Sequence, residues 1–138
     1  MNDDIKWLKR FLSSSNCPGC FENFARPICE MTCSPKQSQF LKVQKVEAAD
    51  ADYRPYVKSM DYSIAHQHLK ATFTSCKMVT FLFRPVLNYM CGDAKGEDCT
   101  LDKWRNYLIE FSKEYHPFQI NYITEPIKNY TSINVPCS

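Results

Sequence analysis

Cys17–Phe40 reads CPGCFENFARPICEMTCSPKQSQF and holds four of the eight cysteines in the chain. Its apolar residues recur at helical spacing, which predicts a helix with one apolar face: Phe21, Phe24, Ile28 and Met31. Pro18 suits the first turn of this helix, where a missing N–H has no cost. Pro27 lies inside the helix and should kink it, and Ser34 and Pro35 should end it. Much of the cross-linking is therefore expected to start from one element.

Eight cysteines in 138 residues are a dense, even set, which is typical of disulfides formed in an oxidising compartment. Zinc binding is an alternative because Cys17 and Cys20 have CxxC spacing, but no second pair follows at finger-like distance. A thioredoxin-type redox pair is another alternative. Such a pair usually follows a strand, whereas an amphipathic helix precedes this one. Cys29 and Cys33 lie four residues apart and so project from one helix face.

The length of 138 residues predicts a single domain, and a 44% hydrophobic composition is enough to fill its core. The net charge of +2 comes from scattered residues, which gives no indication of nucleic acid binding. The longest apolar run, Met78–Phe83, is too short to span a bilayer. The opening MNDDIKWLKRFL is acidic and then amphipathic, unlike a secretory leader. Since the cysteines indicate export, we expect this chain to be a piece of a longer protein.

Hydrophobic periodicity and turn residues predict four main helices and three strands. The helices are expected at 3–14, 18–33, 63–76 and 101–115, with a short further helix at 85–92, and the strands at 40–47, 53–62 and 117–124. The first two strands should form a hairpin, with Pro55 confining its strand to a sheet edge, and Thr100 should cap the last helix. Residues 125–138 read as irregular. The fold class is therefore α+β, with helices packed on a small three-stranded mixed or antiparallel sheet and a disulfide-rich scaffold.

The residues contain no recognisable catalytic constellation. His66 and His68 are two apart on a predicted helix, so they point to different sides and are interpreted as solvated positions. With three glycines in the chain, no Gly-rich phosphate loop is present. We therefore predict that the protein is not an enzyme and needs no cofactor and no metal.

Large apolar side chains gather late in the sequence, at Trp104, Tyr107, Phe111, Pro117 and Phe118, and also at Tyr89 and Met90. These residues fit either an ordinary core or the lining of an apolar ligand cavity, since ligand sites are mostly apolar with few polar anchors.

The motif CPxCxxNxxxxxCxxTCSPxQSxF, which the opening stretch contains in full, resembles the luminal N-terminal sterol-binding domain of the Niemann–Pick type C intracellular cholesterol transporters. Weaker landmarks of that family follow in the same order over nearly all of the chain. They are YSI at 62–64, Cys76, YMCG at 89–92, Cys99, the Trp104 helix, the PF-x-I strand at 117–120, an Asn-x-Thr sequon at Asn129 and a final PCS.

This resemblance implies a lysosomal or plasma-membrane lipid transporter, with the domain on the luminal or extracellular side, that binds cholesterol or a related sterol. A soluble luminal sterol-transfer protein and the remaining membrane domains of the parent would be its partners. The implied sterol-binding wall comprises Phe21, Phe24, Ile28, Met60, Tyr62, Leu108, Pro117, Phe118 and Ile120. The implied rim, where sterol enters and the donor docks, comprises Tyr89, Met90, Asn106 and Tyr107.

The resemblance also implies the disulfides Cys17–Cys137, Cys20–Cys76 and Cys91–Cys99, and glycosylation at Asn129. Relative to the family, residues 1–138 read as a partial domain that lacks the first cysteine-rich segment and the C-terminal end. That segment would supply the polar anchors for the sterol 3-hydroxyl and the partners of Cys29 and Cys33. We therefore expect these two cysteines to be either free thiols or strained partners of each other. We also expect this chain alone to bind sterol weakly or not at all, since a buried hydroxyl without partners costs about 1 kcal/mol or more.

Two other functions are open. A folate- or riboflavin-receptor-like vitamin carrier shares the CxxC…C…CSP layout, but stacks its heterocycle between tryptophans, and this chain has only Trp7 and Trp104. A disulfide-rich interaction module without a small ligand is the other.

Overall fold

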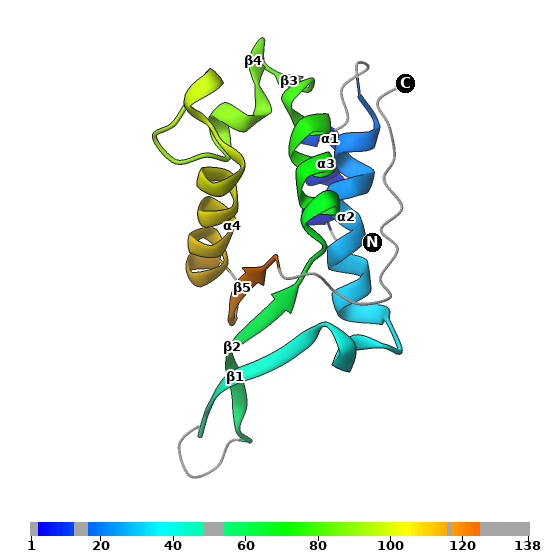
Figure 1. Cartoon of the computed structure of the whole chain (residues 1–138), viewed down its shortest axis with the longest axis vertical. Coiled ribbons are helices and arrows are strands. Elements are labelled where there is room, and N and C mark those ends of the chain that lie inside the picture. Colours follow the sequence, from blue (N-terminus) through cyan, green and yellow to red (C-terminus); the bar gives the residue numbers. More distant parts are fainter. Residues whose placement is uncertain (1–2, 13–16, 49–53, 116, 125–138) are drawn as a thin grey trace.

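The computed structural model describes residues 3–12, 17–48, 54–115 and 117–124 (Figure 1). The helices in these ranges are α1 (Asp3–Leu12), α2 (Gly19–Cys33), α3 (His66–Lys77) and α4 (Leu101–Tyr115). The strands are β1 (Leu41–Glu47), β2 (Tyr56–Ser63), β3 (Thr80–Phe81), β4 (Arg84–Pro85) and β5 (Gln119–Ile123). Three short 3-10 helices complete the described part: η1 (Gln37–Gln39), η2 (Val86–Tyr89) and η3 (Gly96–Asp98).

The main sheet has the order β1–β2–β5 and is mixed. β1 and β2 form the predicted antiparallel hairpin, in which Leu41 lies opposite Tyr62. β5 runs parallel to β2, with Met60 opposite Ile120 and Tyr62 opposite Tyr122. Helices packed on this three-stranded mixed sheet confirm the α+β, disulfide-rich class.

The edge position predicted for the Pro55 strand was wrong, because β2 is the central strand of the sheet. The physical reason is that β2 begins at Tyr56, one residue after the proline. Pro55 therefore lies outside the ladder and removes no hydrogen bond from it.

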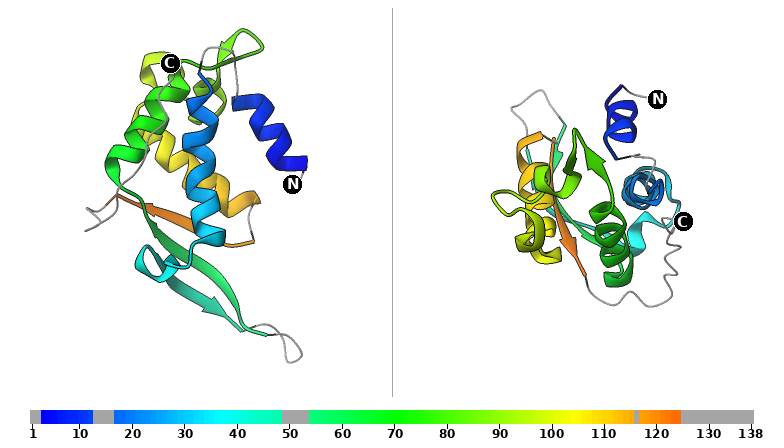
Figure 2. Two further views of the ribbon diagram at one scale, coloured as in Figure 1. Left: turned by 90° about the vertical axis from the view of Figure 1, so that its right-hand side faces the viewer. Right: turned by 90° about the horizontal axis from the view of Figure 1, so that it is seen from above.

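α2 lies between α1 and α3 (Figures 1 and 2). A disulfide joins Cys20 near the start of α2 to Cys76 near the end of α3. α4 packs beside β5, and the Oγ of Ser112 accepts a hydrogen bond from the backbone N–H of Ile120 at 3.0 Å. The core between these elements is built largely from aromatic and aliphatic side chains, with Leu12, Val79, Val86 and Trp104 among the least exposed.

The start of α4 is capped as predicted. The Oγ1 of Thr100 accepts a hydrogen bond from the N–H of Lys103 at 3.4 Å, and the Thr100 carbonyl accepts from Trp104 at 2.9 Å. Such a cap satisfies backbone donors that have no partner within the helix.

A tight hairpin of β3 and β4 lies at the end of the molecule opposite the β1–β2 hairpin (Figure 1). The sequence predicted an apolar run here and a helix over 85–92. The structure instead pairs Phe81 with Arg84 across a two-residue turn and continues into η2, which is a single short turn. Beyond it, a disulfide between Cys91 and Cys99 closes the loop that contains η3. No helix in the described ranges combines the length and the apolar character needed to cross a bilayer.

Candidate functional site

A small apolar cavity lies among α2, α3, α4 and the sheet. Its volume is about 50 Å³, far below the roughly 300–1,000 Å³ of typical small-molecule pockets. The lining residues are Asn23, Phe24, Pro27, Ile28, Met31, Tyr62, Ile64, His68, Leu69, Thr72, Trp104, Leu108 and Tyr122. Most of this wall is apolar, and the polar groups are concentrated where α2 meets α3.

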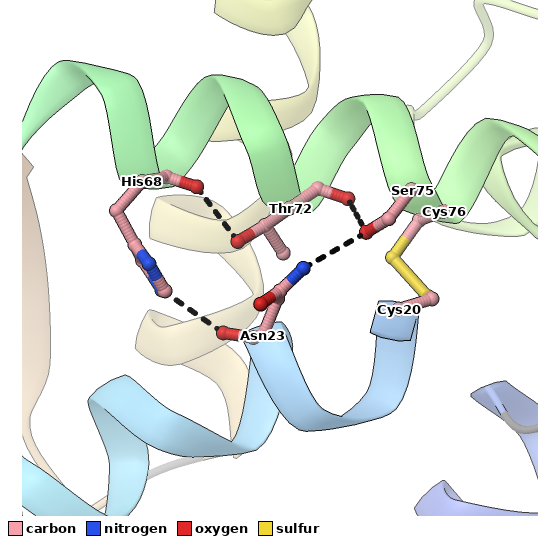
Figure 3. Close-up of a disulfide and its surroundings, with 6 residues drawn as sticks. All are labelled: Cys20, Asn23, His68, Thr72, Ser75 and Cys76. Atoms are coloured by element: carbon pink, nitrogen blue, oxygen red, sulfur yellow. Dashed lines mark hydrogen bonds between the residues drawn. A yellow bond between two sulfur atoms is a disulfide. The ribbon is translucent and has the colours of Figure 1, made fainter. Parts of the chain in front are cut away.

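Four buried polar side chains form a network between α2 and α3, and Figure 3 shows them beside the Cys20–Cys76 disulfide. They are Asn23, His68, Thr72 and Ser75, each at most 6% exposed. The Asn23 amide donates to the Ser75 hydroxyl at 3.4 Å, and that hydroxyl donates to the Thr72 carbonyl at 2.8 Å. The Thr72 hydroxyl in turn donates to the His68 carbonyl at 2.8 Å.

Pro27 explains why a histidine joins this network. In a helix the carbonyl of Asn23 accepts from the N–H of the residue four positions later, and that residue is Pro27, which has none. The ring Nε2 of His68 lies 3.0 Å from this carbonyl oxygen. His68 is 3% exposed, so its predicted solvated position was wrong: the carbonyl freed by the proline supplies a buried hydrogen-bond partner. His66 is exposed as expected.

The cavity brings together four of the residues that the resemblance implied for the sterol wall: Phe24, Ile28, Tyr62 and Leu108. The other five do not line it. Phe21, Met60 and Phe118 are partly buried against the core, Ile120 is 2% exposed, and Pro117 is exposed. Met60 and Ile120 nevertheless lie two residues along their strands from Tyr62 and Tyr122, and therefore on the same face of the sheet. They are therefore continuous with the cavity wall.

Sequence reasoning named Trp104 as a residue of either the core or a cavity lining, but it did not select the polar wall residues or Pro27, Met31, Ile64, Leu69 and Tyr122 as part of the site. One signal for Asn23 and Pro27 was available, since a proline four residues after an asparagine frees a carbonyl inside a helix. No comparable signal placed α3 opposite that carbonyl.

The rim residues implied by the resemblance lie in different surroundings. Asn106 and Tyr107 face a shallow open groove along the Cys91–Cys99 loop, together with Lys103 and Glu110. Trp104 and Leu108, on the same helix, face the cavity, so α4 separates the two hollows. Tyr89 is 41% exposed, whereas Met90 is buried.

Burial raises the pKa of Tyr122 to about 12, so its phenol is neutral at physiological pH. The indole N–H of Trp104 is buried and has no hydrogen-bond partner among the described residues. A hydroxyl oxygen close to this nitrogen could therefore accept a hydrogen bond from it.

The cysteines of the described ranges fall into two groups. Cys20–Cys76 and Cys91–Cys99 are disulfides, both among the pairs implied by the resemblance. Cys29 and Cys33 are free thiols, exposed on the C-terminal half of α2. Cys17 is disulfide-bonded, and its implied partner Cys137, like the sequon residue Asn129, lies outside the described residues.

The described residues also bear on the alternatives. They contain no group of three or more His, Cys, Asp and Glu side chains placed to hold a metal ion. A vitamin pocket of the folate or riboflavin type would need stacked tryptophans. Trp104 borders the cavity, but Trp7 is 60% exposed on α1 and is absent from the cavity lining.

Residues 1–137 match the family described as "Niemann-Pick C1 N terminus". The chain is 37% identical over 101 residues to "NPC intracellular cholesterol transporter 1 homolog 1" of Caenorhabditis elegans, covering 67% of the chain and 7% of that protein. It is 33% identical over 110 residues to "NPC intracellular cholesterol transporter 1 homolog 1b" of Drosophila melanogaster, covering 78% of the chain and 9% of that protein. All of the chain matches 12% of "NPC intracellular cholesterol transporter 1" of Sus scrofa at 28% identity. It thus spans about a tenth of the length of these relatives.

Proposed function

Because the chain belongs to the family of the Niemann-Pick C1 N terminus, we propose that it forms a non-catalytic sterol-binding domain of a lipid transporter. The cavity among α2, α3, α4 and the sheet is the proposed sterol site. One observation carries this assignment: the motif helix α2 walls an apolar cavity that has a few buried polar groups at one side. That combination suits a ligand with a large apolar body and a single hydroxyl.

The cavity has to widen to admit a sterol, because about 50 Å³ is roughly the space of one or two water molecules. The proposed moving part is the C-terminal half of α2. The N-terminal end of α2 is held to α3 by the Cys20–Cys76 disulfide, whereas Ile28, in the C-terminal half, is 38% exposed. Pro27, between them, interrupts the backbone hydrogen bonding and so lowers the cost of bending. The opened site would bury a rigid apolar ligand that loses little conformational entropy.

The sterol hydroxyl would be received by the polar side of the cavity. The hydroxyl of Thr72 retains an acceptor lone pair after donating to the His68 carbonyl, and the Trp104 N–H has no acceptor among the described residues. These groups are supplied by α3 and α4. They would provide hydrogen-bond partners for a buried hydroxyl from within the described residues.

The remaining parts of the proposal concern the protein in its setting. Residues 1–138 would act as one domain on the luminal or extracellular side of a membrane, linked to the membrane part of a larger transporter. A soluble sterol-transfer protein would dock beside the groove, at the rim formed by Tyr89, Met90, Asn106 and Tyr107. A carbohydrate at Asn129 would be compatible with that compartment.

A photoreactive sterol tests the site even where affinity is low. The full chain is irradiated with a photoactivatable cholesterol analogue, with and without excess cholesterol, and the labelled peptides are identified by mass spectrometry. We expect competable labelling of α2 or α4. Leu108→Trp, which fills the cavity, should abolish it. Ile109→Trp, the neighbouring position outside the cavity lining, is the matched control and should preserve it. Labelling that cholesterol does not compete away, or that persists in Leu108→Trp, would refute the proposed site.

A further inference from the structure

The β3–β4 hairpin exposes its two turn residues almost completely. Leu82 is 71% exposed and Phe83 is 103% exposed, more than any other large apolar side chain in the described residues. A folded domain commonly exposes single apolar residues, but a contiguous exposed group at a projecting tip indicates an interaction site. Figure 1 shows this hairpin at the end of the molecule opposite the β1–β2 hairpin.

The backbone of this turn is unfavourable for the residues that it holds. Leu82 and Phe83 have φ values of 49° and 64°, the left-handed conformation that a two-residue hairpin turn of type I′ requires at both positions. Asn and Gly adopt it readily, whereas bulky residues are strained there. Because both side chains are exposed, burial against the rest of the described residues does not offset this backbone strain. Strain retained at a position without a packing role points to function.

Aromatic packing holds the hairpin firmly against α1 and η2. The ring of Phe81 lies 4.9 Å from that of Phe11 and 6.3 Å from that of Tyr89, measured between centroids. Phe11 in turn stacks on Trp7 at 5.1 Å. Trp7 and Met78 are each 60% exposed. The exposed side chains of Trp7, Met78, Leu82 and Phe83 are called the tip surface below.

The charges around the tip surface are mostly basic. Residues 6–12 and 77–92 carry five basic side chains, Lys6, Lys9, Arg10, Lys77 and Arg84, whereas the acidic residues next to these stretches in the sequence are Asp3, Asp4 and Asp93. All five are exposed. An apolar tip that includes tryptophan and is surrounded by Lys and Arg has the composition of elements that lie in the interface of an anionic bilayer.

We propose that the tip surface inserts into the interfacial region of a membrane that contains anionic lipid. Leu82 and Phe83 would enter the acyl boundary, while Lys77 and Arg84 would contact lipid headgroups. The projecting hairpin (Figure 1) and the mostly basic side chains around it favour this occupant over a second copy of the chain, whose corresponding surface would also be mostly basic. The proposal is independent of sterol binding and does not use the cavity.

Vesicle flotation tests it with the full chain. The probes are vesicles of phosphatidylcholine containing phosphatidylserine, and matched vesicles of phosphatidylcholine alone, both without sterol. The wild type should bind the first kind more strongly, with binding that weakens as salt is added. Leu82→Asn/Phe83→Gly should lower binding at least about tenfold, since burial of even one large apolar side chain contributes that much. Arg84→Gln should lower binding to the anionic vesicles by up to about fivefold and leave binding to the neutral vesicles unchanged.

The Asn-Gly variant is chosen because it suits the turn. It should unfold at the same or a higher denaturant concentration than the wild type, so that lost vesicle binding cannot be attributed to misfolding. Val43→Ser, an exposed apolar position on β1 (51% exposed), is the matched control and should bind as the wild type does. The proposal is overturned if the wild type stays unbound, if the Asn-Gly variant binds equally, or if that variant abolishes self-association in solution while vesicle binding persists.

Discussion

The ring Nε2 of His68 on α3 lies 3.0 Å from the backbone carbonyl oxygen of Asn23 on α2. This contact exists because Pro27 has no N–H to offer that carbonyl. The backbone hydrogen bond that α2 lacks at Pro27 is therefore replaced by one from a side chain of α3. Both residues of this contact line the proposed sterol site. Nε2 donates here, so the proton of the ring must reside on that nitrogen.

His68→Leu should lower the free energy of unfolding by about 1–3 kcal/mol, because it removes the imidazole N–H that donates to the buried Asn23 carbonyl. Denaturant-induced unfolding measures this loss. His68→Gln, which retains a donor, should lose less, and His66→Leu at the exposed neighbouring position should be nearly neutral.

A double-mutant cycle can test whether the contribution of His68 to stability depends on Pro27. Pro27→Ala restores an N–H four residues after Asn23, so the carbonyl no longer depends on the histidine. The loss caused by His68→Leu should then shrink in the Pro27→Ala background. An undiminished loss would mean that His68 stabilises the fold through its packing.

Ser112 joins α4 to β5. Its hydroxyl donates to the Ile109 carbonyl at 2.7 Å and accepts from the Ile120 N–H at 3.0 Å, and the residue is 2% exposed. Ser112→Ala should therefore cost about 1–3 kcal/mol, with faster amide hydrogen exchange at Ile120. Ser38→Ala, at an exposed serine, serves as the control. Unchanged exchange at Ile120 would contradict the link.

The two disulfides of the described residues should differ in their contribution to stability. Cys20–Cys76 spans 56 positions and Cys91–Cys99 spans 8. Chain-entropy estimates give about 4 and about 2.5 kcal/mol respectively, because the longer loop restricts the unfolded chain more. Unfolding of Cys20→Ala/Cys76→Ala and Cys91→Ala/Cys99→Ala compares them directly. Equal losses would show that loop length does not govern their effect.

Tyr122 should make stability depend on alkaline pH. Its pKa is about 12 in the folded protein because of burial, against about 10 in an unfolded chain. The raised value means that folding favours the neutral phenol. This contribution is complete below pH 10 and is lost as the pH rises towards 12. In Tyr122→Phe that part of the decline should disappear, as measured by unfolding at a series of pH values, whereas an identical decline would assign it to other groups.

Local patterns predicted most elements of the described chain. The apolar periodicity of α2 and α4, the Thr100 cap and the alternation of the β1–β2 hairpin all depend on neighbours in sequence, so they can be read without the fold. The bounds differed by a few residues. The β3–β4 hairpin was not predicted, because its turn carries Leu82 and Phe83 in place of the Asn and Gly that mark such turns.

The candidate site was predictable only in part. Phe24, Ile28, Tyr62 and Leu108 were selected through the resemblance, and the cavity contains them. The polar side was missed, since it needs α3 to lie against the carbonyl that Pro27 frees. Which of two histidines spaced two apart would be buried depended on that contact and not on the spacing.

The sequence by itself determined the family, through the cysteine motif, and the α+β class, because motif spacing and hydrophobic period are properties of neighbouring residues. Only the tertiary structure decided that the Pro55 strand is central, that His68 completes α2, and that Leu82 and Phe83 project from the surface. Each of these depends on which distant segment lies alongside. Packing sets that arrangement by satisfying buried polar groups and covering apolar surface over the whole chain.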